Sequence, residues 1–202
     1  MPEYEGRVKL RERSFPLEIF GGGPPNRHEL EQEMWLAALQ EPAAAFAPFR
    51  GEDWPTTTLP AFEAAWCAAQ QGEAAGHDYD LRIRRAFFSE SRNIGRREVL
   101  LEIAEEAGLD LSRFSQMFES GEPDRAVLEE GRLGKERYHV RGTPTLMLAD
   151  GTRLHHPIAF PSMENERVVK VGVLPCCGES CLEATRDLFD KALQWAQEKS
   201  EK

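Results

Sequence analysis

The sequence has 202 residues, enough for one domain with a sizeable hydrophobic core that can also carry an inserted subdomain. Its 25 lysine and arginine residues are outnumbered by 35 acidic residues, and the formal charge of -10 argues against nucleic acids or anionic membranes as partners. No apolar run is long enough to span a bilayer, and the first residues lack the apolar segment of a signal peptide. We therefore expect a cytoplasmic protein.

The N-terminal segment, residues 7–13, has the pattern of a strand. Val8 and Leu10 alternate with Lys9 and Arg11, as in a strand that is buried on one side. The glycine- and proline-rich stretch that follows, residues 16–25, predicts a loop.

The middle of the chain has the apolar spacing of helices. Asp110 is expected to cap one of them, and Pro123 suits the first position of the next. The expected helices carry their apolar residues at 30–38, 62–69, 79–88, 99–107, 111–118 and 126–133; the second is expected to run to Gly72 or Gly76, and the fourth to start near Asn93. A further amphipathic helix is expected near the C-terminus, from residue 182 to 196.

A β-hairpin is expected after this helical block. Thr143-Pro144 leads into an apolar run, and Asp150-Gly151 separates that run from a second strand-like segment. Two interpretations of the Thr-Pro pair remain open on spacing alone: a hairpin that happens to begin with proline, or a Thr-Pro peptide bond held cis. Another strand is expected at residues 168–174.

Four cysteines divide into one isolated residue and one cluster. Cys67 lies in a run of small residues on an expected helix, where a lone cysteine usually behaves as a small buried hydrophobe. Cys176, Cys177 and Cys181 fall between an expected strand and an expected helix, and a helix N-terminus stabilises a thiolate. The cluster could be a redox pair, a zinc site with His155 or His156, or a local disulfide or inert thiols.

Several stretches together resemble one known family. Gly142-Thr143-Pro144-Thr145, opening a hairpin, resembles the cis-proline loop of the thioredoxin superfamily. Residues 85–94, 99–104 and 107–110 resemble the helical insertion of DsbA-family proteins, with the FrnE-like dithiol-disulfide oxidoreductases as the most similar group. Residues 8–17 resemble the second strand of that family. The resemblance implies an α+β, thioredoxin-like fold: a small sheet with an inserted all-helical subdomain and a C-terminal helix.

The resemblance also implies a domain division and an activity. A thioredoxin-like domain would comprise residues 1–27 and 134–202, interrupted by a helical insertion at 28–133. The implied activity is that of a thiol-disulfide oxidoreductase or isomerase that acts on disulfide- or thiol-containing proteins, with glutathione as a further candidate partner. No cofactor and no metal is expected.

The expected site has two parts. Cys176 and Cys181 match the spacing of the second, Cys-x4-Cys pair of FrnE-like proteins, with Cys177 as an adjacent thiol. Gly142, Thr143 and Pro144 are the expected substrate-binding residues. In the family the residue before the cis-proline pairs its backbone with a bound peptide, and here that residue is Thr143.

The sequence departs from the family at its beginning. The family starts with a strand and a Cys-x-x-Cys motif, and neither is present in these 202 residues. A sequence without its true N-terminus is the favoured explanation, beside a degenerate binding-only member and a replacement of the lost unit by another segment. Two alternative functions follow. One is a glutathione-dependent isomerase or transferase of the 2-hydroxychromene-2-carboxylate isomerase type, and the other is a non-catalytic peptide-binding or chaperone module.

Overall fold

The chain forms two compact units. A computed structural model describes residues 2–21, 23, 27–40, 45–155, 162–164, 167–170 and 179–200. One unit, called here the terminal unit, combines Met1–Glu12 with Gly142–Lys202, and the other, the helical unit, is Arg13–Arg141.

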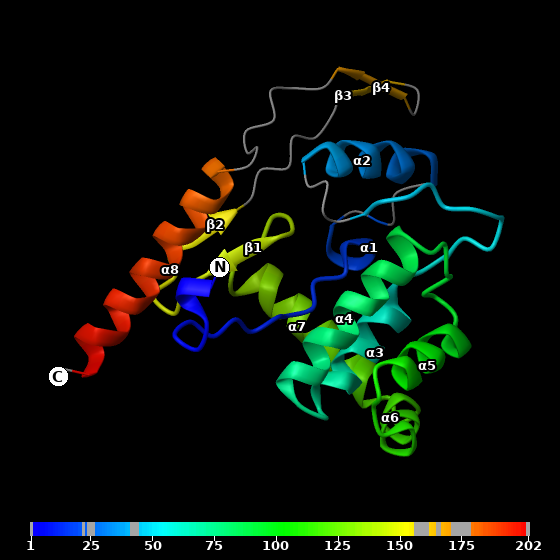
Figure 1. The fold of residues 1–202 in the computed structure, drawn as a ribbon, viewed down its shortest axis with the longest axis horizontal. Helices are drawn as coiled ribbons and strands as arrows, with labels where there is room; N and C mark the ends of the chain where they lie inside the picture. Colours follow the sequence, from blue (N-terminus) through cyan, green and yellow to red (C-terminus); the bar gives the residue numbers. More distant parts are fainter. Residues whose placement is uncertain are drawn as a thin grey trace. The chain divides into compact units, whose positions relative to one another are not determined.

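In its described residues, the helical unit contains helices and no strand (Figure 1). The expected helices are confirmed, with three boundaries corrected. The second ends at Ala69 and not at Gly72 or Gly76, and the fourth begins at Arg97 and not near Asn93. The third, α4, begins six residues before Tyr79, directly after Gly72, whose φ of 139° ends the preceding turn. The short helix α1 was not expected from the sequence. The elements are α1 (Leu17–Phe20), α2 (Arg27–Gln40), α3 (Leu59–Ala69), α4 (Glu73–Phe88), α5 (Arg97–Glu106), α6 (Leu111–Phe118) and α7 (Glu122–Glu136).

The core of the helical unit is built around α3. Its buried residues Ala64, Cys67 and Ala68 are small, so α4, α6 and α7 can approach it closely. Tyr79 of α4 is fully buried, and its hydroxyl donates a 2.7 Å hydrogen bond to the backbone carbonyl of Leu100 in α5. This bond satisfies the polar group of a large core side chain and joins two helices.

Two glycines of α7 form a surface on which the segment before α2 packs. A Cβ atom at Gly131 would lie 2.1 Å from Cε2 of Phe20, and one at Gly134 would lie 2.8 Å from Cδ2 of Phe15. The two phenylalanine rings also contact each other, with centroids 5.6 Å apart. Only a helix surface without side chains leaves room for both rings at this distance.

Polar contacts hold the same segment in register along α7. The carboxylate of Glu130 accepts hydrogen bonds from the Arg13 guanidinium at 2.6 Å and from the backbone N–H of Ser14 at 2.8 Å. Lys135 donates from Nζ to the backbone carbonyl of Phe20, the last residue of α1, at 2.8 Å. Glycine packing and these three bonds together explain why α1 forms where the sequence alone suggested a loop.

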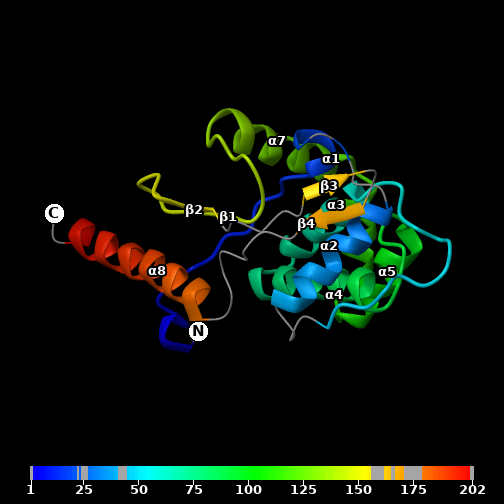
Figure 2. The same ribbon diagram turned by 90° about the horizontal axis from the view of Figure 1, so that it is seen from above.

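The terminal unit contains the strands of the described chain. Strands β1 and β2 form an antiparallel hairpin in which Leu146 is opposite Leu154, and α8 lies beside β2 (Figures 1 and 2). At the turn, Gly151 has a φ of +90° and the Asp150 carboxylate accepts a 2.8 Å hydrogen bond from the Thr152 N–H. The elements are η1 (Pro2–Tyr4), β1 (Thr145–Met147), β2 (Arg153–His155), β3 (Ser162–Glu164), β4 (Arg167–Lys170) and α8 (Glu179–Ser200).

The N-terminal turn is attached to α8 through one tyrosine. The Tyr4 side chain is buried, its ring meets Phe189 edge to face at 5.2 Å, and its hydroxyl bonds the Asp190 carboxylate at 3.0 Å. Desolvation of the ring hydroxyl, with that hydrogen bond, raises the pKa of Tyr4. Glu3 adds an ion pair with Arg186 at 3.3 Å.

The strand expected at residues 7–13 is wrong. Residues 9–16 have no regular secondary structure, and the side chain of Leu10 is 56% exposed. An alternating pattern makes a strand only where a neighbouring strand satisfies its backbone groups, and none of the described strands pairs with this segment. The strand expected at 168–174 is confirmed over Arg167–Lys170, which pairs with β3; its remaining residues lie outside the described chain.

The glycine packing on α7 predicts the effect of one added methyl group. Gly131→Ala is expected to lower the free energy of unfolding by about 1–2 kcal/mol, because the clash with Phe20 outweighs the helix propensity of alanine. Urea denaturation followed by circular dichroism measures the change.

A double mutant separates the clash from a general effect at this position. In a Phe20→Ala background the ring is gone, so adding Gly131→Ala should be neutral or stabilise by up to about 1 kcal/mol. Equal destabilisation in both backgrounds would contradict packing of Phe20 against Gly131.

Candidate functional site

The loop that opens the hairpin is the best-defined candidate site. The peptide bond between Thr143 and Pro144 is cis, the geometry that the resemblance implied. Pro144 is exposed, while Gly142 and Thr143 are half-buried. Strand β1 begins at Thr145, so the loop is attached directly to a hydrogen-bonded ladder.

One side-chain hydrogen bond closes this loop. The hydroxyl of Thr145 donates to the backbone carbonyl of Gly142 at 2.6 Å. Among the described residues, the N–H and C=O of Thr143 have no hydrogen-bond partner. The loop therefore presents a free backbone donor and acceptor beside an exposed proline, which is the arrangement that an added peptide strand requires.

The sequence pointed to Thr145 only as part of the Gly-Thr-Pro-Thr motif and gave it no role. A local signal was present, because threonine hydroxyls often bond backbone carbonyls three or four residues earlier in the chain. Applied to Thr145, that rule identifies the carbonyl of Gly142 as the acceptor.

The cysteine cluster is only partly within the described chain. Cys176 and Cys177 lie outside the described residues, and Cys181 is the third residue of α8, with its side chain outside the description. The redox pairing of these thiols therefore stays a prediction. Among the described side chains there is no group of three or more His, Cys, Asp or Glu residues that could hold a metal ion.

Cys67 is an unreactive core residue, as the sequence predicted. Its side chain is 1% exposed in the centre of the helical unit. Burial, reinforced by the negative charges of Glu63 and Glu122, raises the pKa of the Cys67 thiol to about 12. A thiol with this pKa and no access to solvent cannot act as a nucleophile near neutral pH.

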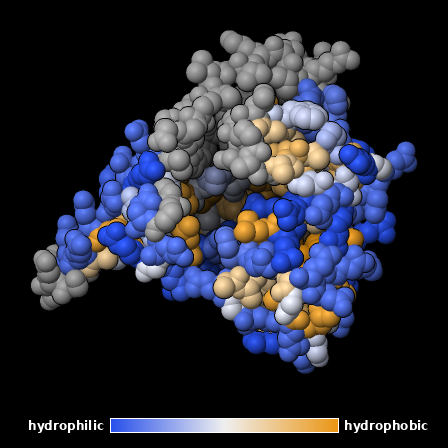
Figure 3. All heavy atoms as spheres, viewed as in Figure 1, coloured by the Kyte–Doolittle hydropathy of each residue, from blue (hydrophilic) through white to orange (hydrophobic). Residues whose placement is uncertain are grey.

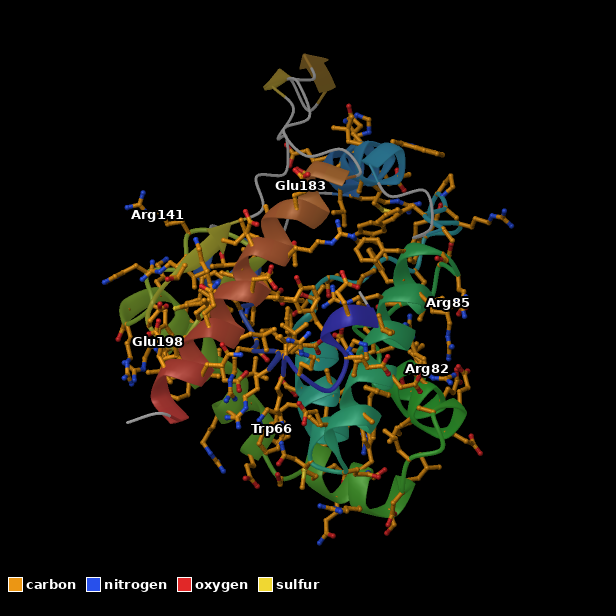
Figure 4. The ribbon with its side chains drawn as sticks, turned by 60° about the vertical axis from the view of Figure 1, so that its left-hand side comes forward. Trp66, Arg82, Arg85, Arg141, Glu183 and Glu198 are labelled. Carbon is orange, nitrogen blue, oxygen red and sulfur yellow. The ribbon has the colours of Figure 1, made fainter. Side chains whose placement is uncertain are left out.

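The outer surface of the helical unit is charged, with its charges paired locally. Arg82 contacts Asp78 at 2.7 Å and Arg84 contacts Asp80 at 2.6 Å, both along α4. Figure 4 shows Arg82 and Arg85 projecting from this helix, and Figure 3 shows hydrophilic side chains over much of the coloured surface, with smaller hydrophobic patches between them. Ion pairs within one helix are typical of a solvated face.

No helix in the described part of the chain could cross a membrane.

Most of the chain matches one known protein family. Residues 4–167 match the DSBA-like thioredoxin domain, a span that includes the helical unit, the Thr143–Pro144 loop and the hairpin. The chain therefore belongs to the DSBA-like thioredoxin domain family and has a thioredoxin-like α+β fold.

One curated protein is similar to part of the chain. A Bacillus subtilis (strain 168) protein described as "Uncharacterized protein YwbO" is 32% identical over 96 residues, which is 48% of this chain and 46% of that protein. The chain thus spans about half the length of this curated relative.

Two solved structures share the fold. A candidate protein disulfide isomerase from Nitrosomonas europaea is similar over 69% of this chain and 59% of its own, with a TM-score of 0.51 and 21% identity. The cytosolic disulfide reductase DsbM from Pseudomonas aeruginosa is similar over 70% of this chain and 69% of its own, with a TM-score of 0.52 and 22% identity.

The burial of Cys67 predicts how the thiols of the native protein react. With a pKa of about 12, roughly one Cys67 in ten thousand is thiolate at pH 8, so the native protein should not expose it to Ellman's reagent. The thiol should react once guanidinium unfolds the chain. Cys67→Ala should leave the number of rapidly reacting native thiols unchanged, and the loss of a fast equivalent in that variant would contradict the burial.

Proposed function

We propose that this protein is a thiol-disulfide oxidoreductase or isomerase of the DsbA/FrnE type, acting on disulfide- or thiol-containing proteins in the cytoplasm. The observation that carries the proposal is the family match over residues 4–167, which includes the Thr143–Pro144 loop. The proposed thioredoxin-like domain comprises residues 1–27 and 134–202, with the helical insertion at 28–133.

The proposed substrate-binding residues are Gly142, Thr143 and Pro144. An extended client segment would lie against the exposed Pro144 and pair its backbone with the N–H and C=O of Thr143, like an added strand. Because these are backbone contacts, they suit clients of many sequences and select for an extended peptide near the client's disulfide.

The proposed reactive thiols are Cys176 and Cys181, with Cys177 adjacent. The thiolate of one attacks a sulfur of the client disulfide, forms a mixed disulfide and releases the other client sulfur as a thiolate. The second thiol then attacks the mixed disulfide, so the client leaves as a dithiol and the Cys176–Cys181 disulfide remains. The client gains two electrons and two protons from the pair, and the reverse reaction oxidises a client dithiol.

Helix α8 offers a physical reason for reactivity at this end of the pair. Cys181 is the third residue of the helix, where backbone N–H groups lack intrahelical partners and the helix dipole is positive. Both effects stabilise a thiolate and lower the pKa of a cysteine at such a position.

Serine substitutions test the proposed thiols. Cys176→Ser and Cys181→Ser should each reduce insulin reduction in the presence of dithiothreitol to background, because either change removes one of the two sulfurs that the exchange needs. Of these two variants, the one that lacks the thiol that attacks second should retain the client as a mixed disulfide, which intact-mass spectrometry detects. Cys67→Ala is the matched control and should keep full turnover.

Other outcomes of the serine test would refute the proposed thiols or favour one of the alternative functions. Full insulin reduction by a Cys176→Ser/Cys177→Ser/Cys181→Ser variant would refute the proposed role of these thiols. Glutathione-dependent isomerase activity in that variant would instead favour the 2-hydroxychromene-2-carboxylate isomerase type. Suppression of client aggregation without either activity in the unmodified protein would indicate a peptide-binding module.

A further inference from the structure

The peptide group between Gly142 and Thr143 is held at one end only. Its carbonyl oxygen accepts the 2.6 Å hydrogen bond from the Thr145 hydroxyl. The cis bonds of the described residues do not include this peptide, so it is trans, and its C=O and N–H point in opposite directions. The Thr143 N–H must therefore point away from the Thr145 hydroxyl.

Glycine at position 142 makes this orientation dependent on the hydroxyl. Rotation of the Gly142–Thr143 peptide group changes ψ of Gly142 and φ of Thr143. Gly142 has no Cβ and places little steric limit on its side of this rotation, whereas the β-branched Thr143 allows a change of tilt but not a complete turn. Thr145, by contrast, is fixed, because it is the first residue of β1 and is paired with His155 across the hairpin. A donor on a rigid strand thus fixes the tilt of a peptide group that Gly142 leaves loosely restricted.

We propose that Thr145 is a positioning residue that holds the Thr143 N–H outward for a bound peptide, an inference that rests on the proposed function. Pro144 has no N–H, so the loop offers the Thr143 N–H as its donor to an added strand. The group that accepts it is a backbone carbonyl of the client. The contact therefore favours peptide disulfides over small disulfides without a peptide backbone.

The test compares two substrates in three variants. The substrates are a disulfide-bonded peptide and hydroxyethyl disulfide, which has no peptide backbone. Thr145→Val removes the hydroxyl with little change in shape, and Thr145→Ser keeps it. Thr152→Val is the matched control, because it removes a threonine hydroxyl that bonds Asp150 at the turn of the same hairpin.

A specific pattern of kinetic constants is expected. Thr145→Val should raise KM for the peptide about fivefold, the effect of losing one ordinary hydrogen bond, with kcat within about twofold of the unmodified protein. KM for hydroxyethyl disulfide should not change. Thr145→Ser and Thr152→Val should behave like the unmodified protein with both substrates.

Three results would overturn the inference: an unchanged peptide KM in Thr145→Val, an equal rise in KM for both substrates, or failure of Thr145→Ser to restore the peptide KM. Absence of turnover in the unmodified protein would instead count against the proposed function. In that case the amide signal of Thr143 in a ¹H–¹⁵N NMR spectrum tests the positioning role of Thr145. It should shift when the peptide is added to the unmodified protein but not to Thr145→Val, and equal shifts in both would refute the positioning role.

Discussion

The hydrogen-bonded register of the β1–β2 hairpin is the constraint on which the candidate site depends. Leu146 opposite Leu154 fixes the position of Thr145, and the Thr145 hydroxyl fixes the carbonyl of Gly142. Because side chains alternate between the two faces of a strand, a slip of one residue would move that hydroxyl to the other face. The Asp150–Gly151 turn prevents the slip, since Gly151 adopts a positive φ that other residues rarely reach.

In the helical unit, the helices pack closely enough to bury large aromatic rings. They do so with small residues at the contacts: alanines and Cys67 on α3, and Gly131 and Gly134 on α7. The surface of α7 at these two glycines carries no side chain and accommodates Phe15 and Phe20. The Glu130 carboxylate accepts a hydrogen bond from the backbone N–H of Ser14, just before Phe15. The segment that leads out of the terminal unit is therefore anchored by packing as soon as it enters the helical unit.

Local signals in the sequence predicted most of the helices and the hairpin. Apolar spacing located the helices, Asp110 was identified as a cap and accepts from the Arg113 N–H at 3.0 Å, and the Asp-Gly pair located the turn. These features depend on residues close together in the chain. The family resemblance supplied what spacing could not, namely the cis Thr143–Pro144 bond and the thioredoxin-like fold.

The structure differs from the pattern of the sequence mainly where residues distant in the chain determine the conformation. The alternation at residues 7–13 is genuine, but a strand needs a partner, and Leu10 is exposed instead. The helix α1 follows Pro16 and precedes a glycine-rich stretch, so local signals favoured a loop, whereas contacts with α7 more than a hundred residues later stabilise a helical turn. The boundary between α3 and α4 is a local exception: the apolar spacing extends the first of the two helices to Gly72 or Gly76, whereas α4 begins at Glu73 in a first turn with few apolar residues.

Position within a helix separates the buried Cys67 from the thiols proposed to be reactive. Cys67 has no access to water, and its surroundings include acidic side chains, so both burial and charge favour the neutral thiol. Cys181 belongs to the first turn of α8, and the reactivity proposed for it would rest on the unpaired backbone N–H groups of a helix N-terminus, which favour a thiolate. Neither residue type nor secondary structure separates Cys67 from Cys181, because both are cysteines within helices. Position within the helix does: a thiol in the interior of a packed helix is protected, and one at a helix N-terminus is activated.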